Sequence, residues 1–128
     1  MKTTPLDQRP AIVLTEDDRS RLTALVEMSA EEDVARFLRE EIARAAIVRT
    51  ELAGRSLITM GSRVRFVERG SSRIQEVELA YPEEADERGR ISVLTPVGSA
   101  LIGLGPGQSI GWIESGVERR LFILDVIG

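Results

Sequence analysis

The side chains best suited to chemistry in this 128-residue chain are carboxylates gathered near the end of its first quarter. With the serine between them, they are Glu27, Ser29, Glu31, Glu32 and Asp33. Carboxylate oxygens are the ligands that hard cations prefer, so this segment could present an acidic tip to a metal ion. The same residue types also cap helices, and Ser29 followed by Glu32 has the spacing of a capping box. We expect capping and no metal site, because a tip that serves a distant metal needs longer reach.

Other catalytic chemistries are limited by composition. The chain has no cysteine and no histidine, which excludes Cys nucleophiles, His bases, disulfides and the usual zinc sites. The glycine-rich run 103–107 lacks the following Lys-Ser/Thr and the helix of a phosphate-binding loop. We therefore expect no catalytic residue, no cofactor and no small-molecule substrate.

Charge and hydropathy limit the partners. The net charge is −4, and acidic and basic residues are spread evenly, so direct binding to nucleic acid would lack its main energetic contribution. No apolar run approaches the ~20 residues that span a bilayer, and the start lacks the apolar region of a signal peptide. We expect a cytoplasmic protein with no membrane partner.

Residues 91–104 are the most informative segment. Ile91 and Val93 predict a strand that ends before Pro96, and proline suits the first turn of a helix. Thr95 is a good N-cap for that helix. Apolar residues then recur at helical spacing, before a Gly-Pro-Gly turn and another strand that ends in a tryptophan. These apolar residues, which we expect mainly in the core, are Val97, Ala100, Leu101, Ile102 and Leu104.

The first half of the chain predicts two helices. Thr15 is an N-cap before three acids, and a second helix is predicted from the acidic segment to about Val48. The connection is short, so the helices must be antiparallel, as a short coiled coil. The apolar stripe of the second helix, which includes Phe37 and Leu38, is narrow and rich in alanine at its end. We expect it to contact the first helix; the alternative is that the helices cover a sheet.

After Gly61 the apolar period changes from 3.6 to 2, which predicts strands. Residues 121–126 are apolar on both faces, so we place them in the centre of the sheet. The predicted fold class is α+β, with a helical hairpin in residues 1–53 and a small antiparallel sheet with one short helix in residues 54–128.

Several of these motifs resemble known proteins. The segment with Thr95, Pro96, Ala100 and Leu101, and the run Gly61-Ser62-Arg63-Val64, resemble the carboxy-terminal domain of bacterial Gre transcript-cleavage factors. The pair Tyr81-Pro82 and the run 9–14 resemble the Rnk branch, named as regulators of nucleoside diphosphate kinase. The resemblance covers nearly the whole chain.

The resemblance implies an FKBP-like sheet without isomerase activity, docked at the rim of the RNA polymerase secondary channel. The docking residues it implies are Leu94, Thr95, Pro96 and Val97, with Leu94 where Gre factors have an acid. Rnk proteins have a shortened coiled coil and do not cleave RNA. The implied function is a non-enzymatic transcription regulator that competes with Gre-type factors, with any effect on nucleoside diphosphate kinase indirect. The alternatives are a transcript-cleavage factor and, from topology alone, a prolyl isomerase.

Overall fold

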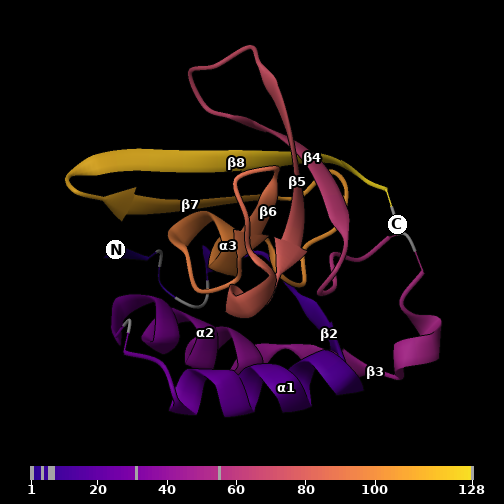
Figure 1. The fold of residues 1–128 in the computed structure, drawn as a ribbon. Coiled ribbons are helices and arrows are strands. Elements are labelled where there is room, and N and C mark those ends of the chain that lie inside the picture. The colour runs from indigo at the N-terminus through magenta and orange to yellow at the C-terminus, as the bar shows by residue number, and fades with distance from the viewer. Residues whose placement is uncertain (1, 4, 6–7, 31, 55, 128) are drawn as a thin grey trace.

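After a short first strand, the chain forms two helices whose outer ends meet at a short strand pair (Figure 1). The rest of the chain completes a six-stranded sheet, which includes the first strand, with one short helix against it. The structure is a computed structural model that describes residues 2–3, 5, 8–30, 32–54 and 56–127. We call residues 16–44 the hairpin and residues 56–127 the head. The α+β class and the helical hairpin are confirmed.

The hairpin consists of α1 (Glu16–Glu27) and α2 (Glu32–Arg44), which lie side by side in Figure 1. α1 begins where predicted, because the Asp18 N–H donates to the Thr15 hydroxyl at 3.1 Å and so gains a partner that the helix cannot supply. Near the other end, Arg39 of α2 donates to the carbonyl oxygen of Val26 at 3.3 Å. The helices are thus antiparallel neighbours.

The predicted extent of the second helix is wrong. α2 ends at Arg44, and Ala46–Val48 form strand β3, which pairs in parallel with β2 (Val13–Thr15). The Ala46 N–H donates to the Ile12 carbonyl oxygen at 3.1 Å instead of continuing the helix. The apolar spacing of this segment fits a helix, but a partner strand far away in sequence supplies the hydrogen bonds that decide its conformation.

The main sheet has the strand order β1-β7-β8-β4-β5-β6. These strands are β1 (Lys2–Thr3), β4 (Arg63–Glu68), β5 (Ile74–Ala80), β6 (Arg90–Ser92), β7 (Ser109–Glu114) and β8 (Val117–Val126). Short 3-10 helices η2 (Thr50–Leu52) and η3 (Pro82–Glu84) lie in the connections. The prediction of a fully antiparallel sheet is wrong at one place, because β6 pairs in parallel with β5. The segment between them, with η3, crosses over before β6 begins.

Strand β8 lies inside the sheet, between β7 and β4, which agrees with the central position predicted for residues 121–126. Its two faces differ, however. Leu121 and Ile123 are buried, whereas Phe122 and Leu124 are 41% and 40% exposed. The position in the sheet was correct, but the second apolar face of this strand is not covered by the described residues.

A continuous hydrophobic core joins the hairpin to the head. Side chains of α1 and α2, such as Leu22 and Leu38, belong to the same buried cluster as Leu101 of helix α3 (Pro96–Leu101) and Leu121 of the sheet. The helices therefore pack on each other and also cover the head, so both alternatives for the apolar stripe hold.

None of the described helices is both long and apolar enough to pass through a membrane. The FKBP-like topology and the division into domains at residues 53 and 54 stay predictions.

Candidate functional site

The turn at residues 94–97 is held by one threonine. The Thr95 hydroxyl accepts a hydrogen bond from the Gly98 N–H at 3.0 Å and donates to the carbonyl oxygen of Ser92 at 2.7 Å. The Thr95 N–H reaches the same carbonyl at 3.1 Å. Pro96 occupies the first turn of α3, where its missing N–H costs nothing. The predicted N-cap is confirmed, and it fixes the direction in which β6 passes into α3.

Gly98 allows this turn to be so tight. A Cβ atom at position 98 would lie 2.0 Å from the carbonyl oxygen of Ser92, a distance that no side chain tolerates. The same carbonyl oxygen is the acceptor for Thr95. Sequence reasoning gave Gly98 no role; its place one turn after the N-cap was the available signal for close packing.

The four predicted docking residues lie together on this turn. Leu94, Thr95, Pro96 and Val97 are each partly exposed, and Leu94 and Val97 also pack against the core. The apolar residues that follow, Leu101, Ile102 and Leu104, are at most 2% exposed and belong to the core, as expected. The turn therefore presents a small surface of mixed character on a rigid base.

The acidic residues predicted for the hairpin tip serve several structural roles. Glu27 is the last residue of α1. The N–H groups of Met28 and Ser29 donate to the carbonyl oxygens of Leu25 and Val26, in the last turn of α1, at 3.1 and 3.3 Å. Glu32 and Asp33 lie in the first turn of α2, where acids oppose the helix dipole. Asp33 also forms an exposed ion pair with Arg36. Glu31 lies outside the described residues.

Those described acids form no metal centre. Within residues 2–3, 5, 8–30, 32–54 and 56–127, no group of three or more Asp, Glu, His or Cys side chains is placed to hold a metal ion. The apolar side chain of Met28, which is 87% exposed, lies at the tip beside the acids.

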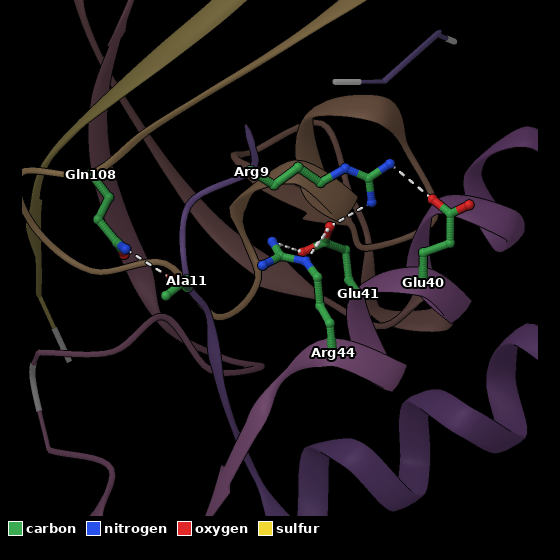
Figure 2. Close-up of polar contacts among 6 residues, drawn as sticks. All are labelled: Arg9, Ala11, Glu40, Glu41, Arg44 and Gln108. Atoms are coloured by element: carbon green, nitrogen blue, oxygen red, sulfur yellow. Dashed lines mark hydrogen bonds and ion pairs between the residues drawn. The ribbon is translucent and has the colours of Figure 1, made fainter. Parts of the chain in front are cut away.

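A buried ionic cluster lies at the base of α2 (Figure 2). Arg9 donates to Glu41 at 2.9 Å and to Glu40 at 2.8 Å, and Arg44 donates to Glu41 at 2.6 Å. The side chains of Arg9 and Glu41 are only 4% and 2% exposed. The Arg9 guanidinium also lies 5.0 Å from the centroid of the Phe37 ring. A carboxylate buried to this degree requires such partners, since an unpaired charge in the core is costly.

Sequence reasoning missed this cluster, because Arg9 and Glu41 lie 32 positions apart and no local pattern links them. Arg9 is the first residue of a segment, residues 9–15, that we call the strap. The strap also contacts the head. The Gln108 side-chain amide donates to the Ala11 carbonyl oxygen at 2.8 Å, as Figure 2 shows. The Val13 N–H donates to the Gly103 carbonyl oxygen at 3.1 Å.

The base of α1 contacts the head through Asp18, which is 7% exposed. Its carboxylate accepts a hydrogen bond from the Met60 N–H at 3.0 Å. Burial raises the pKa of Asp18, although the Met60 hydrogen bond opposes the shift. One turn later, the Arg21 guanidinium lies 4.0 Å from the centroid of the Tyr81 ring. Burial and, to a smaller extent, the charge of Asp18 raise the pKa of Tyr81 to about 12.

A further network connects the neighbouring strands β7, β8 and β4 and is structural. Arg119 donates to both carboxylate oxygens of Glu68 at 2.8 Å, and Trp112 donates from its indole N–H to Glu114 at 2.9 Å. The hydrogen bond from Arg119 lowers the pKa of Glu68. Trp112 is 2% exposed, so it belongs to the core and offers no binding surface.

Comparisons with known proteins divide the chain into two matched segments. The family described as "Rnk N-terminus" matches residues 10–48, and the family described as "Transcription elongation factor, GreA/GreB, C-term" matches residues 54–127. The "Regulator of nucleoside diphosphate kinase" of Escherichia coli K12 is 34% identical over 122 residues, which cover 92% of this chain and 90% of the relative. The "Transcription elongation factor GreA" of Thermodesulfovibrio yellowstonii is 32% identical over 74 residues, 57% of this chain and 47% of the relative.

Solved structures show the same fold. The "Prokaryotic transcription elongation factor GreA/GreB from Nitrosomonas europaea" superposes with a TM-score of 0.76 at 35% identity, and the match covers 94% of this chain and 100% of that one. Thermus aquaticus Gfh1 superposes with a TM-score of 0.50 at 17% identity, over 92% of this chain and 99% of that one, which indicates the fold alone.

Proposed function

This chain belongs to the Rnk family, with a carboxy-terminal half of the GreA/GreB type, and from that premise we propose that it regulates transcription by binding RNA polymerase at the rim of the secondary channel, without catalysing RNA cleavage. Relatives of both halves support a role in regulation: one is named as a regulator and others as transcription elongation factors. Fold alone does not give function, so the proposal depends on the site.

The observation that carries the proposal is the turn at residues 94–97, built on a Gre-type head. Thr95, Pro96 and Gly98 combine an N-cap, a fixed φ and a close backbone contact, so the turn keeps one shape before any partner binds. Leu94 and Val97 add apolar surface beside the threonine and the proline. A small rigid turn of this kind suits docking onto a protein surface, and we assign it that role.

The hairpin suits occupation of a channel mouth better than chemistry deep inside the channel. α1 has 12 residues and α2 has 13, so each helix is about 18–20 Å long at 1.5 Å per residue. The described acids at the tip lie at helix ends, and Asp33 pairs with Arg36. We therefore propose competition with Gre-type factors for the same mouth. Any change in nucleoside diphosphate kinase levels would follow from transcription.

The test is a competition experiment with purified RNA polymerase. A labelled Gre factor is bound to the polymerase, and this protein is added at increasing concentration; we expect displacement of the label. Arrested elongation complexes are then incubated with this protein alone, and we expect no shortened RNA. Efficient cleavage would favour the alternative, a Gre-type cleavage factor. Absence of both binding and displacement would overturn the proposal.

A further inference from the structure

We infer that the strap fixes the position of the hairpin tip relative to the docking turn at residues 94–97, with Arg9 and Gln108 as its positioning residues. The biological meaning of this inference rests on the proposed function, but the geometry does not. The strap, residues 9–15, lies between the hairpin and the head and makes polar contacts with both.

On the hairpin side, the strap holds the base of α2. Arg9 contacts Phe37, Glu40 and Glu41, which span about one turn of that helix. Strand β2 of the strap then pairs with β3, which follows α2 after a single residue. The end of α2 is thus attached to the strap by ion pairs, a ring contact and backbone hydrogen bonds.

On the head side, the strap is attached at two points of one loop, residues 102–108 between α3 and β7. Gln108 reaches the Ala11 carbonyl oxygen at 2.8 Å, and the Gly103 carbonyl accepts from the Val13 N–H. The strap packs closely on the backbone of Gly103, where a Cβ atom would lie 2.9 Å from the Cβ of Ile12. Ile12 and Leu14, which are 3% and 1% exposed, belong to the core that the hairpin and the head share.

The base of α1 has its own polar contact with the head, from Asp18 to Met60. Asp18 lies in the first turn of α1, at the end away from the tip. Arg21 also lies over the Tyr81 ring, and core side chains such as Leu22 pack between α1 and the head. These contacts hold α1, and the strap supplies the polar anchor at the base of α2, so that both ends of the hairpin base are attached to the head.

For the proposed function, the strap would set the distance between the hairpin tip and the turn at residues 94–97. When the turn at residues 94–97 is docked, the position of the tip follows from the strap rather than from contacts made inside the channel. Rigid preorganisation of this kind lowers the entropy lost on binding. A loosened strap would leave docking possible but spread the tip over several positions.

The test measures the distance from the tip to the head in the free protein. The chain has no cysteine, so spin labels attach cleanly to two introduced residues, Met28→Cys at the tip and Val117→Cys in the head, at positions that are 87% and 62% exposed. Pulsed electron paramagnetic resonance should give one narrow distribution of distances between the two spin labels. In the Arg9→Ala and Gln108→Ala backgrounds, we expect it to broaden about two-fold or more, as further orientations become populated.

Three controls keep the result specific to the strap. Arg9→Lys keeps a charge near Glu41 and should restore a narrow distribution in part, and Arg65→Ala removes a partly exposed ion pair elsewhere and should change nothing. Circular dichroism checks that each variant is folded; Gln108, which is half-exposed, provides the test if Arg9→Ala unfolds. A broad distribution in the unmodified strap, or a narrow one in both alanine variants, would overturn the inference. Because no polymerase is present, this result is independent of the competition experiment.

Discussion

Glu41, a carboxylate that is 2% exposed, accepts a hydrogen bond at 2.9 Å from Arg9, which lies 32 positions earlier in the chain. The ion pair joins the strap to the last turns of α2, and Arg44 shares the same carboxylate. A buried pair of this kind is weak evidence for net stabilisation, but the loss of one partner leaves an uncompensated charge in the core.

The first prediction concerns this pair. Arg9→Ala should lower the free energy of unfolding by about 3 kcal/mol, because Glu41 loses one of its two cationic partners inside the core. Urea unfolding followed by circular dichroism measures the change. The matched control is Arg65→Ala, whose partner Asp125 is 46% exposed and which should cost about 1 kcal/mol or less. Equal losses for the two variants would contradict the prediction.

The second prediction concerns docking. Pro96→Asp should abolish binding to RNA polymerase while the fold stays intact, because the substitution puts a charge on a partly exposed surface and removes the fixed φ of the turn. Co-elution with polymerase and circular dichroism provide the two readouts. Pro106→Asp, at an exposed turn, is the matched control and should bind normally. Unchanged co-elution of the Pro96 variant would remove the assigned role of this turn.

The third prediction concerns the contact between Gly98 and Ser92. Gly98→Ala should destabilise the protein by about 1–3 kcal/mol, since the new methyl group would overlap the Ser92 carbonyl oxygen and force α3 away from β6. The loss is measured by urea unfolding. The variant should also bind polymerase less tightly, because the turn changes shape. A stability equal to that of the parent chain would show that the close packing is not required.

The fourth prediction uses the pH dependence of Asp18. Its raised pKa means that the folded chain keeps a proton above pH 3.8 that the unfolded chain has lost, so this residue makes the protein less stable as the pH rises through that window. Asp18→Asn keeps an acceptor for Met60 but removes the titration. The stability of the variant relative to the parent should therefore rise between about pH 3.8 and the raised pKa and then level off. Unfolding curves from pH 3 to pH 7 check this, and a flat difference would refute it.

The fifth prediction has the opposite sign. The Arg119 hydrogen bond lowers the pKa of Glu68, so the stability that this pair adds is complete above the ordinary value of 4.5 and is lost as the pH falls through the lowered value. Glu68→Gln should be less stable than the parent at pH 7, and the two should converge in acid. A difference that persists at the lowest accessible pH would assign the effect to packing instead.

Local signals predicted local features well. The caps at Thr15 and Thr95 were correct, because the acceptor and the donor lie within three residues of each other. The start of α3 at Pro96 was predicted for the same reason, whereas the docking role of residues 94–97 came from the resemblance and stays a prediction. Strand β3 was assigned to the helix, because the partner that makes it a strand is β2, which precedes both helices. The parallel pairing of β6 also depends on a crossover that period and turn residues do not specify.

The parts of the candidate site that were missed depend on distant partners. The buried position of Glu41 was not predicted, because its partner Arg9 lies 32 residues upstream. The close contact at Gly98 depends on how α3 packs on the end of β6, which spacing alone does not show. Asp18 was read only as an acid in a first turn, whereas its partner is the backbone of Met60, 42 residues away.

The parallel pair of β2 and β3 has one more consequence. It brings together the residues immediately before α1 and just after α2, so that the chain enters and leaves the helical hairpin at the same place. A hairpin whose two ends are paired in this way can change its length at the tip while the strand pair at its base stays the same. Whole heptads added in register to both helices should therefore lengthen the hairpin and leave the remainder of the fold as it is.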